Sequence, residues 1–345
     1  MERLRILVTV PKCHADVWRR FLTDRVLKEM HELGDVVYNE LDRPYTTEEL
    51  RDALVDIDVA VASWGTLRFD EEVLSKANRL KIIAYAAGSV ASLVSDAIYE
   101  KGILLLSGNT VFAESVAECT LCYIMCSLRN LRHFFMTPER PWRTGDEDAE
   151  KGIMDRTIGI VGYGMISKYF LKMLEPFHVK KKIYSGHITE EEAAKYGATV
   201  ATLDEIFETC DIISLHSGLN EKTYHMIQEK HLKKMQDGAL LVNTARGAIV
   251  DEEALIRELQ TGRIYAALDV FETEPLPADS PLLTMENVIC LPHIGGPTVD
   301  RGEYVTLKLI DEIKKWQNGE TEFECEIKKS YAANMTKEGY KPPQN

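Results

Sequence analysis

The chain has 345 residues, of which 45% are hydrophobic and 28% are charged, and its formal net charge is −14. This length exceeds what one hydrophobic core usually supports, so we expect a globular protein with two domains. The excess of 55 acidic over 41 basic side chains argues against nucleic acids or anionic membranes as partners, because like charges repel. An anionic substrate would therefore need positive charge gathered at its site.

The first residues indicate a strand and not a targeting segment. A short apolar stretch within residues 1–18 is followed at once by polar residues, without the small-residue cleavage site of a signal peptide. No apolar run approaches the length that spans a bilayer, so we expect no membrane partner. The seven cysteines are scattered and odd in number, which favours a reducing, cytoplasmic setting.

In the first third of the chain, short β-rich runs alternate with amphipathic segments. The expected strands are residues 5–10, 36–40, 58–63, 81–87 and 102–107. The expected helices are a stretch from Trp18 to Met30, segments near 46–55 and 70–78, and a helix that ends at about Lys101. Such alternation predicts a parallel sheet with helices on both faces.

A long apolar helix is expected from about Glu114 to Leu131, followed by a polar connection over residues 133–152. Cys119, Cys122 and Cys126 share one face of this helix. A metal or redox site was weighed against buried packing thiols, and packing is favoured because no fourth ligand lies nearby in the sequence. We therefore expect no metal.

A second α/β series runs from Thr157 to about Pro297, and one long helix is expected after Val299, ending near Asn318. The sequence GIVGYGMIS (159–167) lies between an apolar strand and a segment with helical spacing. Gly162 permits a tight turn and Gly164 lets the backbone approach a pyrophosphate, which the free N–H groups of the helix N-terminus would bind. Ser167 stands where the dinucleotide-binding pattern has its third glycine.

The acidic residue that would hydrogen-bond an adenosine ribose 2′-hydroxyl is missing from its usual place, where the chain has Ser185. Ser185 can donate to a 2′-phosphate and His187 can add positive charge, which would favour NADP. Alternatively, Ser185 only relaxes the selectivity. The sequence leaves NAD and NADP open, with a slight preference for NADP.

Polar residues follow three apolar runs of the second series. Arg246 follows residues 238–245, Glu274 follows 265–273, and His293 follows 287–292. In open α/β sheets ligands bind beyond the carboxyl ends of the strands, so we expect these side chains at one sheet edge. A histidine can donate a proton to a developing alkoxide, a carboxylate can orient it, and an arginine can hold a substrate carboxylate.

Each of these residues also has a simpler explanation: a surface salt bridge for the arginine, a turn residue for the glutamate and a turn cap for the histidine. His216 follows another apolar run. We weighed a place for His216 in the cofactor cleft against packing in the core, and packing is favoured.

Taken together, the motifs resemble the D-isomer-specific 2-hydroxyacid dehydrogenases, a family that includes phosphoglycerate dehydrogenases and glyoxylate/hydroxypyruvate reductases. The resemblance covers residues from about Ile82 to Gly319. It depends on GIVGYGMIS, DIISLHSGLNEKT (211–223), LLVNTARGAIVDEEAL (240–255), AALDVFETEPLP (266–277) and VICLPHIGG (288–296).

The resemblance implies roles for individual residues. Arg246, Glu274 and His293 would form the catalytic set, and Asp269 would face the nicotinamide carboxamide. The loop 86–90 would cradle the substrate carboxylate. The implied substrate-binding residues are Trp64, Gly88, Ser89, Val90 and Arg246, and the implied cofactor-binding residues are Gly162, Gly164, Met165, Ile166, Ser185, His187, His216, Thr244, Ala245 and Asp269.

The resemblance also implies the architecture, an α/β chain with two doubly wound parallel-sheet domains. A flavodoxin-like substrate domain would comprise residues 1–107 and 300–325, a Rossmann cofactor domain residues 108–299, and a polar tail residues 326–345. A homodimer built around the cofactor domain and its long apolar helix is the usual form. The small-molecule partner would be a 2-oxo or 2-hydroxy acid.

Trp64 and Gly65 stand where phosphate-handling relatives carry a basic residue. This departure favours a glyoxylate/hydroxypyruvate-type reductase over a D-3-phosphoglycerate dehydrogenase, which stays as an alternative. A dinucleotide-sensing binding protein, similar to the corepressors built on this fold, is the alternative from another class. A hydrolase of the adenosylhomocysteine type is disfavoured because its motifs are missing.

Overall fold

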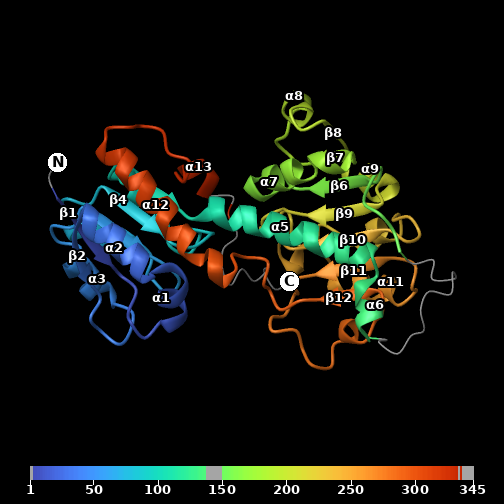
Figure 1. Cartoon of the computed structure of the whole chain (residues 1–345), viewed down its shortest axis with the longest axis horizontal. Helices are drawn as coiled ribbons and strands as arrows, with labels where there is room; N and C mark the ends of the chain where they lie inside the picture. Colours follow the sequence, from blue (N-terminus) through green and yellow to red (C-terminus); the bar gives the residue numbers. More distant parts are fainter. Residues whose placement is uncertain (1–2, 137–149, 333–334, 336–345) are drawn as a thin grey trace. The chain divides into compact units, whose positions relative to one another are not determined.

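The structure is a computed structural model that describes residues 3–136, 150–332 and 335. The chain divides into two compact units. Among the described residues, the first unit comprises those up to Ala113 together with those from Pro297 to Met335, and the second runs from Glu114 to Gly296 (Figure 1). These limits differ by a few residues from the boundaries after 107 and 299 that the sequence suggested.

The first unit is built on a five-stranded parallel sheet in the order β2-β1-β3-β4-β5, the flavodoxin-like order. Within it, Ile6 pairs with Val36 on one side and Val59 on the other. The strands are β1 (Leu4–Val8), β2 (Gly34–Tyr38), β3 (Val59–Ala62), β4 (Ile82–Tyr85) and β5 (Leu104–Ser107). Every residue of β3 and β4 is buried, as expected for central strands with helices on both faces.

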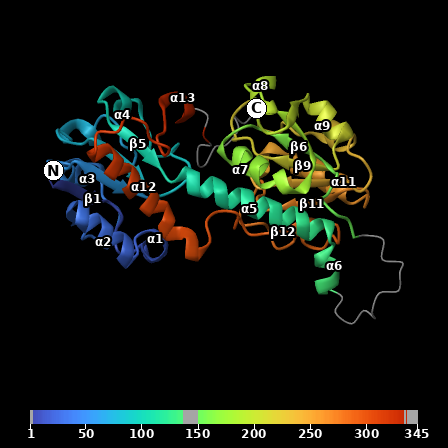
Figure 2. The same ribbon diagram turned by 45° about the horizontal axis from the view of Figure 1, so that its top comes forward.

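Helices α1 (Ala15–Phe21), α2 (Asp24–Leu33) and α12 (Gly302–Gln317) lie side by side against this sheet, although α12 is far away in sequence (Figures 1 and 2). The single helix expected from Trp18 to Met30 is thus wrong. The Thr23 side chain accepts a hydrogen bond from the Val26 N–H and starts a second helix.

A second hydrophobic cluster contains residues of α3 (Thr47–Ala53), α4 (Asp96–Glu100) and the 3₁₀ turn η1 (Val73–Lys76). The helix expected near 70–78 is therefore only this one turn.

The polar tail expected over residues 326–345 is wrong for its first part. Glu326 forms an antiparallel bridge with Leu106, and the Ile327 N–H donates to the Leu105 carbonyl at 2.9 Å. Ile327 and Ala332 are buried in the core of the first unit, and α13 spans Lys329–Ala332. These two apolar side chains explain why the segment packs. Most of the remaining tail lies outside the described residues.

The second unit is built on a seven-stranded parallel sheet in the order β12-β11-β10-β9-β6-β7-β8 (Figure 1). Six of these strands reproduce the Rossmann order, and β12 extends the sheet beyond β11. The strands are β6 (Thr157–Val161), β7 (Lys180–Tyr184), β8 (Ala198–Val200), β9 (Ile212–Leu215), β10 (Leu240–Asn243), β11 (Tyr265–Leu268) and β12 (Val288–Cys290). The prediction of two doubly wound parallel-sheet domains is confirmed.

The helices of the second unit connect consecutive strands of this sheet. They are α7 (Met165–Met173), α8 (Glu190–Ala194), α9 (Leu203–Thr209), α10 (Glu229–Leu232) and α11 (Glu252–Leu259), with the 3₁₀ turns η2 (Glu175–Phe177), η3 (Gly247–Ile249) and η4 (Pro281–Leu283). A further 3₁₀ turn, η5 (Val299–Arg301), precedes α12.

Helix α5 spans Asn109–Leu128 and is followed by α6 (Leu131–Met136). It begins before the expected Glu114, because the Ser107 side chain accepts the Asn109 N–H at 3.2 Å. By length and composition α5 could cross a membrane, so the expectation that no apolar run approaches that length is wrong. Of its most apolar window, 44% is buried inside the chain, and an interior helix of a globular protein meets the same criterion.

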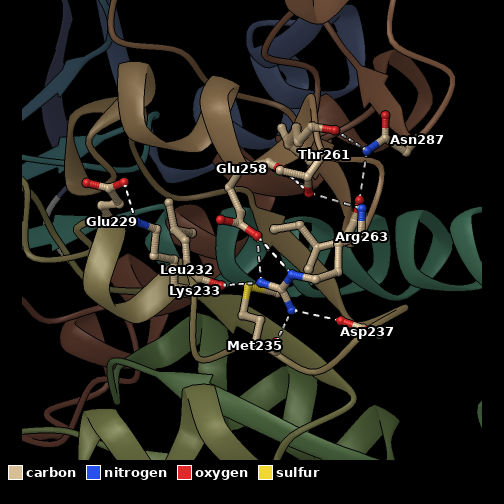
Figure 3. A network of polar contacts seen from close by, with 11 residues as sticks. Glu229, Leu232, Lys233, Met235, Asp237, Glu258, Thr261, Arg263 and Asn287 are labelled. Atoms are coloured by element: carbon tan, nitrogen blue, oxygen red, sulfur yellow. Dashed lines mark hydrogen bonds and ion pairs between the residues drawn. The ribbon is translucent and has the colours of Figure 1, made fainter.

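Arg263 connects the segments that precede β10 and β11 through hydrogen bonds (Figure 3). Its guanidinium donates to the buried Glu258 carboxylate at 2.6 and 3.0 Å, to the Leu232 carbonyl at 3.1 Å, and to the Met235 carbonyl. Asn287, just before β12, donates to the Leu259 and Ile264 carbonyls. This network therefore lies at the amino ends of the three strands whose carboxyl ends carry the candidate site.

Candidate active site

The glycine loop lies between β6 and α7. Gly162 has φ of 102°, and a Cβ there would lie 2.6 Å from the Ser217 nitrogen, so only glycine fits. Apart from Gly164 itself, its chain neighbours and the backbone of α7, no atom of the described residues lies within 4 Å of an ideal Cβ at Gly164. Met165 and Ile166 begin α7, which has no side-chain cap at Gly164, and the first N–H groups of a helix have no partner within it. The loop therefore has the tight turn and the exposed helix end that a pyrophosphate requires.

Ser167 replaces the third glycine of the pattern without opening the loop. Its side chain is fully buried and its hydroxyl donates to the Gly162 carbonyl at 2.8 Å. The added polar atom is thus paired, and it holds the first turn of α7 to the loop.

Ser185 follows β7, the neighbour of β6 in the sheet. Its hydroxyl lies 3.2 Å from His187 Nδ1, and His187 Nε2 lies 2.9 Å from the Tyr163 carbonyl oxygen. The Tyr163 hydroxyl donates to Glu192 at 2.7 Å, and Lys195 pairs with the same carboxylate at 2.9 Å. The structure therefore brings Ser185 and His187 next to the glycine loop, where the nearby carboxylate is already neutralised.

His216 lies at the end of β9 and is buried against Phe170. Its Nε2 is 2.9 Å from the Ser214 hydroxyl, while its buried Nδ1 has no hydrogen-bond partner among the described residues. Burial lowers the pKa of His216 to about 3, so the ring is neutral at physiological pH. These contacts are those of a packed core histidine.

Thr244, Ala245 and Arg246 follow β10. Thr244 and Ala245 are buried, and the Thr244 hydroxyl lies 3.0 Å from that of Thr120 on α5. The Arg246 guanidinium donates to the Ala245 carbonyl at 2.6 Å, and Asn243 donates to the Arg246 carbonyl. Arg246 is thus placed at the carboxyl edge of the sheet, one strand away from the exit of β11.

Glu274 and His293 come from the neighbouring exits of β11 and β12, and their side chains are in contact. Glu274 Oε2 lies 2.8 Å from His293 Nδ1, while Glu274 Oε1 accepts the Phe271 N–H at 3.0 Å. The His293 side chain is half exposed. The contact engages Nδ1 and leaves Nε2 on the other side of the ring.

Asp269 has a buried carboxylate that holds the backbone next to His293. It accepts the N–H groups of Ile294 and Gly295 at 2.9 and 2.8 Å, and the hydroxyl of Tyr123 at 3.1 Å. A carboxylate has about four lone-pair positions, so one on Oδ2 is left. Tyr123 was missed from the sequence, because an aromatic residue in an apolar helix gives no sign that its hydroxyl meets a carboxylate.

Two of the substrate-binding residues suggested in the first unit, Trp64 and Gly88, lie against Phe112. Trp64 packs edge-on against Phe112 with ring centroids 6.1 Å apart, and a Cβ at Gly88 would lie 3.4 Å from the same ring. Ser107 donates to the Gly88 carbonyl at 2.7 Å, which fixes the loop that also contains Ser89. Val90 is buried, and its N–H is directed at Met335 Sδ at 3.4 Å.

Cys119, Cys122 and Cys126 of α5 are the three thiols for which the sequence favours packing over a metal site. Cys122 and Cys126 have sulfurs 3.9 Å apart, and all seven cysteines are free. Within residues 3–136, 150–332 and 335, no group of three or more His, Cys, Asp or Glu side chains has the arrangement of a metal site.

Comparison with known proteins gives matches over most of the chain. Residues 121–295 match the family described as "D-isomer specific 2-hydroxyacid dehydrogenase, NAD binding domain". The chain is 35% identical over 324 residues to D-3-phosphoglycerate dehydrogenase of Methanocaldococcus jannaschii, covering 92% of this chain and 58% of that protein. It therefore spans little more than half the length of that relative.

Two further relatives match over most of their own length. The chain is 34% identical over 275 residues to a hydroxypyruvate reductase of Thermotoga maritima, covering 78% of this chain and 87% of the relative. The solved structure of the PH0520 protein of Pyrococcus horikoshii superimposes with a TM-score of 0.75 at 27% identity, over 96% of this chain and 97% of that one.

Proposed function

Because this chain belongs to the D-isomer specific 2-hydroxyacid dehydrogenase family, we propose that it is an oxidoreductase that interconverts a 2-oxo acid and a D-2-hydroxy acid with a nicotinamide dinucleotide. The observation that carries this proposal is the 2.8 Å contact between Glu274 and His293. It lies at the carboxyl edge of the same sheet whose β6 leads into the glycine loop.

His293 is the proposed proton donor and acceptor. Hydride transfer to the 2-oxo group places negative charge on its oxygen, and a histidine can supply a proton near neutral pH and take it back in the reverse direction. Glu274 holds Nδ1 and so fixes the ring, leaving Nε2 for the substrate oxygen. Arg246 is proposed to bind the substrate carboxylate and to polarise the carbonyl group.

The dinucleotide, when bound, supplies the hydride for reduction and accepts it in oxidation. Gly162, Gly164 and the first turn of α7, which contains Met165 and Ile166, are proposed to hold its pyrophosphate. The tight turn at Gly162 and the open space at Gly164 fit this group. Thr244 and Ala245 next to Arg246, and Asp269 next to His293, are proposed to border the nicotinamide end, and His216 to support the loop from beneath.

The adenosine end is proposed to accept NADP as well as NAD, with a slight preference for NADP. An aspartate would repel a 2′-phosphate, and the chain has Ser185 there. The Ser185 hydroxyl and the His187 ring lie 3.2 Å apart, so both can turn toward one phosphate.

The proposed substrate is a small 2-oxo acid with an uncharged side chain, such as glyoxylate or hydroxypyruvate. Trp64 stands in an aromatic group with Phe21 and Phe112, and these three uncharged rings cannot form an ion pair with a substrate phosphate. The loop with Gly88, Ser89 and Val90 is proposed to bind the substrate carboxylate through its backbone. The hydroxypyruvate reductase of Thermotoga maritima is a relative with a matching substrate class.

One set of assays tests the proposal. The purified protein is given NADH or NADPH with glyoxylate, hydroxypyruvate or 3-phosphohydroxypyruvate, and oxidation of the cofactor is followed. We expect turnover with the two uncharged-side-chain acids and loss of orders of magnitude in kcat for His293→Asn. If neither NADH nor NADPH is oxidised with any of the three acids, the proposed oxidoreductase activity is wrong. If 3-phosphohydroxypyruvate is the preferred acid, the proposed substrate class is wrong.

The second unit is further proposed to form a homodimer through the exposed side of α5 and α6. Met125 on α5 is exposed, and Phe135 and Met136 on α6 are 75% and 71% exposed. Large exposed apolar side chains on two consecutive helices favour an interface there. Sedimentation velocity of the wild type and of Phe135→Asp tests this proposal, because a dimer through this surface should weaken in the variant.

A further inference from the structure

Asp269 fixes the turn that carries His293. The residue is 1% exposed, and its two carboxylate oxygens accept the N–H groups of Ile294 and Gly295, the two residues after His293. His293 itself has φ of 55°, in the left-handed region, and its side chain is half exposed. Packing therefore contributes little to its position. The hydrogen bond of its own side chain to Glu274 and those of the next two N–H groups to Asp269 contribute more.

Gly295 is the residue that lets the carboxylate come this close. A Cβ at Gly295 would lie 2.9 Å from Asp269 Oδ2, closer than real Cβ atoms are found. The Asp269 carboxylate thus packs directly against the backbone of Gly295. If the carboxylate shifts, the backbone of the turn must shift with it.

Tyr123 supplies the third hydrogen bond to the Asp269 carboxylate. It is buried on α5, and its hydroxyl donates to Asp269 Oδ1, the same oxygen that accepts the Ile294 N–H. Burial is the main reason why the pKa of Tyr123 is raised, so the hydroxyl keeps its proton and serves as a donor. One turn earlier on α5, Thr120 contacts Thr244, which precedes Arg246.

We propose that Tyr123 is a positioning residue for the reaction, because its hydroxyl orients Asp269 and Asp269 in turn holds the His293 turn. The inference depends on the proposed role of His293 as proton donor. Without the hydroxyl, a buried carboxylate loses one of its three donors, and the remaining two N–H groups no longer have a fixed partner. Misplacement of a reacting group by about 1 Å is enough to slow a reaction, so a displaced His293 should transfer its proton more slowly.

The test is Tyr123→Phe, which removes one oxygen atom and keeps the ring. We expect kcat for reduction to fall by about 10-fold with KM for the 2-oxo acid within about twofold, since the change affects the reacting geometry and not substrate binding. The deuterium isotope effect on kcat with 4-deuterated reduced cofactor should rise as chemistry becomes slower. In the protein without cofactor, amide hydrogen exchange at Ile294 and Gly295 should accelerate.

Two further variants make the test specific. Tyr99→Phe removes another partly buried tyrosine hydroxyl, which donates to the Ile327 carbonyl at 3.1 Å in the first unit, and it should leave kcat and both amides unchanged. Gly295→Ala disturbs the Asp269 contact from the other side and should reproduce the kinetic effect of Tyr123→Phe.

Wild-type kcat and wild-type exchange at Ile294 and Gly295 in Tyr123→Phe would overturn the inference. If the wild type itself reduces no 2-oxo acid, the proposed function fails, while faster exchange in Tyr123→Phe would still show that Tyr123 holds the turn. Equal loss of activity in Tyr99→Phe would assign the effect to general stability and would also overturn the inference.

Discussion

Glu274 Oε2 and His293 Nδ1 are 2.8 Å apart although they come from two different strand exits. Glu274 Oε1 is also engaged, because it accepts the Phe271 N–H at 3.0 Å. The glutamate is therefore fixed by its own loop before it orients the histidine. The orientation of His293 should therefore depend on the charge of Glu274.

Replacing Glu274 by glutamine should reduce kcat for 2-oxo acid reduction by about 100-fold, because an amide cannot favour the same tautomer and charge on His293. The matched control is Glu272→Gln, two residues earlier, whose carboxylate lies 2.6 Å from His225. It should retain kcat within about twofold. Steady-state assays give kcat for both variants. Equal losses of kcat in Glu274→Gln and Glu272→Gln would contradict a specific role for Glu274.

Ser185→Asp should change the choice of cofactor. An aspartate would repel a 2′-phosphate and accept a hydrogen bond from a 2′-hydroxyl, so KM for NADPH should rise by at least about 10-fold while KM for NADH falls or stays. Ser185→Ala controls for loss of the hydroxyl alone. If the aspartate variant keeps the wild-type ratio of the two KM values, Ser185 does not contact the ribose.

The sheets and the strand exits could be predicted from the sequence, because they depend on local signals. Apolar runs and their flanking polar residues led to both parallel sheets and to Glu274 and His293, whose contact the structure provides. Such signals work because the carboxyl ends of parallel strands share one edge.

Other features depend on contacts between distant residues and gave no local signal. Tyr123 and Asp269 are 146 positions apart. The apolar sequence of the helix gives no sign that the Tyr123 hydroxyl meets a carboxylate. Composition predicts a polar tail around Ile327, because a single isoleucine does not reveal that its N–H meets the Leu105 carbonyl.

His216 should make the stability of the second unit depend on pH. Its pKa is lowered to about 3 by burial, whereas an unfolded histidine titrates near about 6.5. Below about pH 6.5, His216 binds a proton in the unfolded chain but stays neutral in the folded chain. The free energy of unfolding therefore decreases as the pH falls. From pH 7 to pH 5 the loss from this residue should be about 2 kcal/mol.

Urea unfolding of the wild type and of His216→Gln at both pH values measures this effect. The variant will be less stable at pH 7 through altered packing, but the difference between pH 7 and pH 5 should shrink. His31→Gln, at an exposed histidine of the first unit, is the control. An unchanged pH difference in His216→Gln would show that other groups cause it.

Arg263→Leu should destabilise the protein by about 3–5 kcal/mol, because it leaves the buried Glu258 carboxylate without its cation. The matched control is Arg257→Leu on the neighbouring helix, whose contact with Glu253 is long and exposed and contributes less than about 1 kcal/mol. Adding Glu258→Gln to Arg263→Leu should restore part of the loss, since the unpaired charge is removed. Equal free energies of unfolding for Arg263→Leu and Arg257→Leu would show that the network in Figure 3 contributes no more than a surface ion pair.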